Sequence, residues 1–232
     1  MTTFVLCTWA SVLIFLVLVR VKFIWTRPNY VRLSWFAIMG MAAGFPALLI
    51  NSFLSRETEF WVASGNPLLS FGGFFVGAGM GEEFVKLSAG VLVLMLVGRR
   101  ATDVGRLLGM ITVGLAFAAM ENIVAYSNLD FWSLMARGVI TVPLHACLGA
   151  IHGVAINSAW HTRRATPIVI GYFAAVVIHT FADTWYLMMP GVPAKWILSP
   201  FLAVLVAWSC RAWYRTPEVD DSMVIEPHKS VS

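Results

Sequence analysis

Eight ionisable side chains lie within long apolar stretches of this sequence. They are Glu82, Glu83, Lys86, Glu121, His145, His152, His179 and Asp183. Carboxylates and imidazoles can activate water for hydrolysis, either as a general base alone or as ligands of a zinc ion with a further carboxylate as base. No Ser or Cys has an evident base partner by spacing, so a covalent nucleophile is not indicated. The pattern therefore predicts a hydrolytic site.

Four of these residues are predicted to lie at one depth. Glu83 and Glu121 lie 16 and 15 residues from the basic residues that end their own apolar stretches, and His145 and His179 lie 18 and 15 residues from theirs. At 1.5 Å per helical residue, all four are ~22–27 Å from those basic ends. Helices of alternating direction would thus bring carboxylates and imidazoles into one layer. Because ionisable groups are costly in a membrane, such a layer indicates a function.

Individual members also have structural explanations. Glu82 and Lys86 are four residues apart and could neutralise each other on one helix face. Asp183 follows His179 by four residues, so it could serve only to orient the ring. We interpret His152, which lies deeper in its stretch, as a hydrogen-bonded packing residue.

The composition indicates the elements that must position these side chains. Of 232 residues, 59% are hydrophobic and 12% are charged, against roughly 25% charged in soluble domains. Repeated apolar stretches reach the 18 residues or more that are needed to cross about 30 Å of hydrocarbon. The net charge of +4 comes from short basic clusters between these stretches, where positive charge sets topology. We therefore expect an integral membrane protein in contact with the lipid bilayer, and no nucleic-acid partner.

The three cysteines indicate neither a disulfide framework nor a Cys-type zinc site. Cys7, Cys147 and Cys210 all fall in apolar stretches without paired spacing.

The predicted fold is an all-α, polytopic bundle of about seven transmembrane helices. The predicted spans are residues 3–24, 33–54, 67–97, 105–126, 138–160, 166–188 and 196–214. Twelve of the 16 Lys and Arg residues fall on one side, which places the N-terminus outside and the C-terminus in the cytoplasm. Residues 1–215 form one membrane domain, and the polar residues 216–232 are predicted to be a disordered cytoplasmic tail. Gly73, Gly77 and Gly81 form overlapping GxxxG patterns, which favour close helix packing.

At the ionisable residues, the chain resembles the PrsW family of intramembrane proteases, relatives of the CAAX-processing and bacteriocin-immunity protease group. The matching motifs are Glu82-Glu83-Phe84-Val85-Lys86 (EExxK), Phe117 to Glu121-Asn122 (an aromatic followed by Glu-Asn), His145, and His179 to Asp183. They occur in the family's order and cover the third to sixth predicted spans, about half of the chain. The resemblance implies a protease of the bacterial cell membrane that cleaves membrane-anchored proteins near the outer face. Anti-sigma factors are the substrate class associated with the family.

The expected roles follow from this resemblance and from the residue types. Glu82 and Glu83 would supply the general base and a neighbouring carboxylate, and Lys86 would hold the pair in place. The residues expected to bind zinc are Glu121, His145 and His179, and those expected to support these ligands are Asn122 and Asp183.

Two other mechanisms remain open from the sequence. Without metal, the same residues would position water in a glutamate-type protease. Buried carboxylates and histidines also form proton relays, so a proton-coupled transporter or channel is an alternative. The EExxK pattern does not recur in the other half of the chain, which counts against an inverted-repeat transporter.

Overall fold

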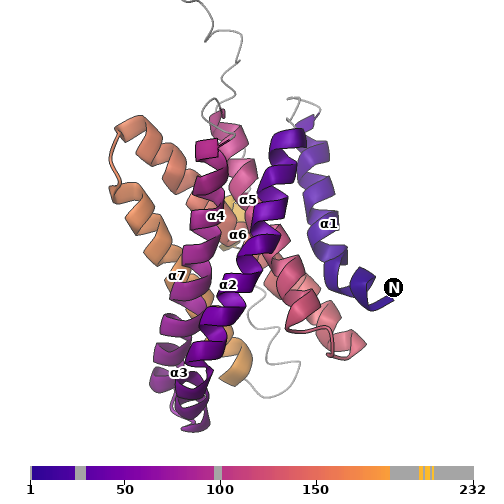
Figure 1. Cartoon of the computed structure of the whole chain (residues 1–232), viewed down its shortest axis with the longest axis vertical. Coiled ribbons are helices and arrows are strands. Elements are labelled where there is room, and N and C mark those ends of the chain that lie inside the picture. The colour runs from indigo at the N-terminus through magenta and orange to yellow at the C-terminus, as the bar shows by residue number, and fades with distance from the viewer. Residues whose placement is uncertain are drawn as a thin grey trace, which may run out of the picture.

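The computed structural model describes residues 2–23, 30–96, 101–188, 204–205, 207–209 and 211, and this part of the chain is all-α (Figure 1). The helices are α1 (Thr2–Phe23), α2 (Tyr30–Ala63), α3 (Pro67–Phe74), η1 (Phe75–Glu82), α4 (Glu83–Leu96), α5 (Asp103–Val124), α6 (Phe131–Thr162) and α7 (Thr166–Met188). This confirms the predicted fold class.

Four helices of the described part are long and apolar enough to cross a membrane. They contain the candidate spans Val31–Leu54, Asp103–Val124, Phe131–Thr162 and Thr166–Tyr186. The protein is therefore an integral membrane protein, as predicted. The total of seven spans and the orientation stay predictions. The expected last span, 196–214, lies largely outside the described residues, and the expected tail, 216–232, lies wholly outside them.

Helices α5 and α6 form the centre of the bundle. In the most apolar stretch of each of these two helices, 72% of the residues are buried. The corresponding share is 33% in α2 and 39% in α7. Figure 1 shows α1 on one side of this pair and α7 on the other. Gly114 of α5 lets the two backbones approach closely, because a Cβ there would collide with the carbonyl oxygen of His145 on α6. This contact fixes the height of the two helices relative to each other.

Helix α6 begins at a side-chain cap. The Asp130 carboxylate accepts hydrogen bonds from the Ser133 hydroxyl (2.6 Å) and from the backbone N–H groups of Trp132 (2.9 Å) and Ser133 (3.1 Å). The pKa of the Asp130 carboxyl group lies below its usual value, mainly because Ser133 donates hydrogen bonds to it. The cap satisfies orphan N–H groups of the first turn and so determines where α6 starts.

Residues 67–96, which make up most of the predicted third span, form three consecutive helical segments, α3, η1 and α4. Segment η1 is a π-helix, a wide turn that is rare and often marks functional sites. Tyr172 of α7 donates a hydrogen bond to the Met80 carbonyl within it (3.0 Å). Gly81 has the close packing that its GxxxG pattern predicted, because a Cβ there would lie 2.9 Å from Cγ2 of Ile50 on α2. The π-helix is thus held between α2 and α7, directly before the two glutamates.

Candidate active site

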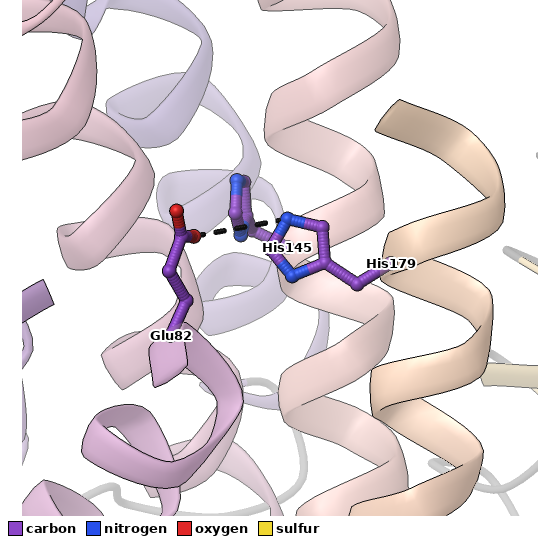
Figure 2. A group of neighbouring side chains, drawn as sticks. All are labelled: Glu82, His145 and His179. Atoms are coloured by element: carbon purple, nitrogen blue, oxygen red, sulfur yellow. Dashed lines mark ion pairs between the residues drawn. The ribbon is translucent and has the colours of Figure 1, made fainter. Parts of the chain in front are cut away.

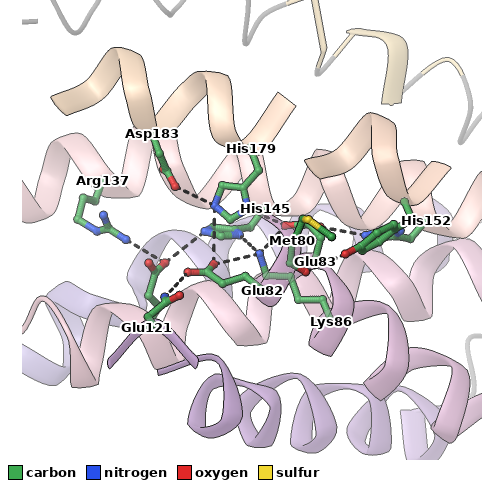
Figure 3. A network of polar contacts seen from close by, with 12 residues as sticks. Met80, Glu82, Glu83, Lys86, Glu121, Arg137, His145, His152, His179 and Asp183 are labelled. Atoms are coloured by element: carbon green, nitrogen blue, oxygen red, sulfur yellow. Dashed lines mark hydrogen bonds and ion pairs between the residues drawn. The ribbon is translucent and has the colours of Figure 1, made fainter. Parts of the chain in front are cut away.

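Glu82 and Glu83 are both buried at the junction of η1 and α4, and Lys86 lies one turn later on α4. The Lys86 Nζ donates to Glu83 Oε1 (2.7 Å) and lies 3.5 Å from Glu82 Oε2. It also lies 4.2 Å from the centre of the Phe117 ring. The ion pair expected between Glu82 and Lys86 is therefore present, but the shorter contact of Lys86 is with Glu83 (Figure 3).

Glu83 is held by donors from three helices. Besides Lys86 of α4, its oxygens lie 2.9 Å from His152 Nε2 of α6 and 2.8 Å from Nδ1 of His179 on α7. The carboxylate is 0% exposed. Because Nδ1 of His179 donates to Glu83, a neutral His179 ring keeps its lone pair on Nε2, which is the arrangement typical of a metal-binding imidazole.

His152 is thus hydrogen-bonded, as expected, but its partner is a carboxylate of the predicted site. His152 was not predicted to belong to that site, because it lies seven residues from His145 in the sequence. Those seven residues are two helical turns, which place both rings on the same face of α6.

His145 lies between Lys86 and Glu121. A charged Lys86 has no lone pair, so its Nζ donates to His145 Nδ1 over 2.9 Å. Nε2 of His145 lies 3.2 Å from Glu121 Oε2 but does not make a hydrogen bond with it or with any other described residue. Because Nδ1 accepts from Lys86, the hydrogen of a neutral His145 ring lies on Nε2, and this nitrogen could bind a metal only after giving up that hydrogen.

Arg137, at the start of α6, holds Glu121 in place. Its guanidinium donates to Glu121 Oε2 (3.0 Å) and to Asn122 Oδ1 (2.7 Å), and it lies 3.5 Å from the centre of the Tyr126 ring. Asn122 in turn donates to the Cys7 carbonyl of α1 (3.2 Å). Arg137 directly precedes the predicted span 138–160, and the structure shows that it is buried. Its place two turns before His145, at the end of an apolar stretch, was the only signal.

Glu82, His145 and His179 come together in a group that could hold a metal ion (Figure 2). Each offers one ligand atom, and these atoms lie within 4.8 Å of one another. Two imidazoles and one carboxylate are a ligand set of catalytic zinc. Two of the three expected ligands are members of this group, while the third, Glu121, lies beside His145 and is paired with Arg137. Asp183, expected to support the ligands, has its Oδ2 3.4 Å from His179 Nε2.

The formal charges of the site also suit a dication. Four carboxylates meet two permanent cations, which leaves an excess of two negative charges when the histidines are neutral. The carboxylates are Glu82, Glu83, Glu121 and Asp183, and the cations are Lys86 and Arg137. One divalent ion would balance this excess. The donor types and the charge therefore both fit a zinc ion.

A cavity of about 690 Å³ gives access to this group. Its walls come from α2, α3, η1, α5, α6 and α7, and they extend to Leu129 and Ser133 at the α5–α6 connection. Glu82 and Glu121 line it with both histidines of the metal group, whereas Glu83 and Lys86 do not. A molecule in the cavity would therefore meet Glu82 and Glu121, but not Glu83.

The comparison with protein families agrees with these motifs. The model for PrsW family intramembrane metalloproteases matches residues 28–209, a range that contains every residue of the site. No curated protein and no solved structure matches the chain significantly.

Proposed function

Because the chain belongs to the PrsW family of intramembrane metalloproteases, we propose that it cleaves membrane-anchored proteins with a zinc ion held by Glu82, His145 and His179. The observation that carries this proposal is the approach of these three ligand atoms to within 4.8 Å of one another. They lie on the wall of a cavity large enough for a short peptide segment. When bound, zinc supplies Lewis acidity, which polarises a carbonyl group and eases the deprotonation of water.

We assign the general base to Glu121. It lines the cavity and lies next to a ligand histidine, and the ion pair with Arg137 keeps its carboxylate facing that histidine. Its role is to take a proton from the attacking water and deliver it to the leaving amine. This assignment exchanges the roles that the sequence suggested for Glu82 and Glu121.

Glu83 acts from outside the cavity. Since it is buried behind the metal group and accepts hydrogen bonds from Lys86 and His179, it orients the imidazole and cannot reach the water in the cavity. Glu83, which follows the proposed ligand Glu82 in sequence, thus supports a second ligand, His179.

The position of the cavity supports the substrate class that the family resemblance implies. In the predicted topology, the α5–α6 connection lies on the outer side of the membrane, so the cavity opens toward that side. A protein anchored by a single span could place the residues next to its anchor there. Anti-sigma factors of this kind are the class that the family resemblance suggests.

Metal content and cleavage, measured on the same variants, test these roles. Purified wild-type protein should bind about one zinc ion per chain and cleave a single-span substrate, and a strong chelator should stop cleavage. Glu82→Gln should lose both zinc and activity, whereas Glu121→Gln should keep zinc and lose activity. His161→Gln, at a largely exposed histidine near the end of α6, is the matched control and should retain both.

Two outcomes would contradict the proposal in different ways. If Glu121→Gln loses zinc and Glu82→Gln keeps it, the ligand set expected from the sequence is the correct one. If active protein contains no metal and is indifferent to chelators, the site works as a metal-free glutamate-type protease.

A further inference from the structure

Asn51 brings α2 into contact with the site. It lies within the apolar span Val31–Leu54, where a polar side chain is costly unless it is paired. Its Nδ2 donates to Glu82 Oε1 over 3.0 Å, across 31 residues of sequence. None of the sequence motifs includes α2, and Asn51 was not among the predicted site residues.

The two carboxylate oxygens of Glu82 have different partners. Oε1 accepts from Asn51, while Oε2 lies 3.7 Å from His179 Nε2 and 3.5 Å from the Lys86 Nζ. Only the contact with Asn51 falls within the usual range of an N–H···O hydrogen bond, 2.7–3.2 Å. Asn51 is thus the short contact that fixes the carboxylate plane, and it leaves Oε2 facing the imidazole of the metal group.

The other end of the Asn51 side chain makes no such contact. Its Oδ1 is buried and has no hydrogen-bond partner among the described residues. Buried amides that serve helix packing usually have both ends satisfied. Here only the donor end is used, which indicates that the contact with Glu82 determines the orientation of this residue.

The backbone is shaped to permit the contact. Gly81 precedes Glu82, and Ile50 precedes Asn51. A Cβ on Gly81 would lie only 2.9 Å from Ile50 Cγ2. The absence of a side chain therefore lets α2 approach η1 closely enough for the Asn51 amide to reach the carboxylate.

We propose that Asn51 is a positioning residue of the metal site, which holds Glu82 so that one of its oxygens faces the ion. The inference rests on the proposed function, since it requires that Glu82 is a metal ligand. It makes α2, which also lines the cavity at Leu48 and Leu54, part of the metal site.

The test is the zinc affinity of the detergent-purified full-length protein, measured by competition with a zinc-chelating dye. Residues that hold metal ligands in place typically change metal affinity about 10–100-fold when removed. We expect Asn51→Ala to weaken zinc binding by this factor and saturating zinc to restore cleavage. Asn51→Leu, of similar size and suited to an apolar helix, should behave in the same way if Asn51→Ala does not fold.

The matched control is another buried asparagine at a distance from the metal group. Asn157 accepts a hydrogen bond from Arg106 (2.7 Å) and donates to the Asp103 carbonyl (2.9 Å). Asn157→Ala should lower the thermal midpoint and leave zinc affinity unchanged. If the wild type binds zinc and both Asn51 variants bind it within about twofold of wild type, far below the expected change, the positioning role is wrong while the proposed function stands. If the wild type binds no zinc, both are wrong.

Discussion

Replacing Lys86 with methionine should make the stability of this protein depend on metal. Lys86 is 2% exposed and meets Glu82, Glu83 and His145 within 3.5 Å. Methionine fills a similar volume but leaves two carboxylates in the interior without their nearest cation. Breaking a buried ion pair costs about 3–5 kcal/mol, and in a chain of this length about 1 kcal/mol shifts the thermal midpoint by 2–4 °C. We therefore expect metal-free Lys86→Met to melt about 6–20 °C below wild type.

Zinc should reverse part of this loss, for two reasons. Without Lys86, the site carries one more uncompensated negative charge, which attracts a dication more strongly. The amine also no longer donates to Nδ1 of His145, so this nitrogen can carry the hydrogen while Nε2 keeps its lone pair for a metal. Zinc at 100 times its dissociation constant stabilises a protein by about 2.7 kcal/mol, and each tenfold gain in affinity adds about 1.4 kcal/mol. The midpoint of Lys86→Met should therefore rise by several degrees more than that of wild type when zinc is added.

The assay is thermal unfolding in detergent with and without zinc, and Arg106→Met is the matched control. Arg106 forms a buried ion pair with Asp103. Arg106 lies 15 residues before Glu121 on α5, and thus about 22 Å from it along the helix. Its loss should lower the midpoint without changing the response to zinc. Two results would contradict this prediction. Metal-free Lys86→Met could have the same thermal midpoint as wild type, or zinc could raise the midpoints of Lys86→Met and Arg106→Met equally.

Three further changes test other parts of the structure. His152→Leu removes a hydrogen bond to Glu83 and should lower cleavage at least ~10-fold, whereas His152→Gln keeps an N–H donor and should retain most of it; equal cleavage by the two variants would contradict this role. Gly114→Ala should lower both cleavage and the thermal midpoint, because its Cβ would collide with the α6 backbone; a variant with wild-type cleavage and midpoint would show that the helices can separate at no cost. An alkaline-phosphatase fusion after Asn128 should be active and one after Arg164 inactive, as measured in cells, and the reverse pattern would invert the predicted orientation.

Much of the site could be predicted from the sequence because ionisable residues are conspicuous in apolar helices. Glu82, Lys86 and His179 needed no structure to be recognised, since each would be costly in a membrane without a purpose. Their depth also followed from counting, because every helical residue rises by 1.5 Å. The membrane class and the family could be recognised for the same reason, and the family match over residues 28–209 confirms both.

Residues that are neutral, or that lie at the end of a span, gave no comparable signal. Asn51 is a single amide in an apolar helix, and Arg137 lies where a basic residue usually marks the membrane boundary. Both were found only because the structure places them 3.0 Å from a carboxylate oxygen on another helix.

The direction in which each side chain points was decided by the tertiary structure alone. Spacing in the sequence gives the height of a residue along its helix, but not the rotation of that helix against its neighbours. Rotation depends on close contacts between helices, such as those of Gly81 with α2 and of Gly114 with α6, and the π-helix before Glu82 alters it again. For this reason the sequence could predict two carboxylates and two imidazoles in one layer. Only the packed helices brought Glu82 next to the imidazoles, turned Glu83 away from the cavity and paired Glu121 with Arg137.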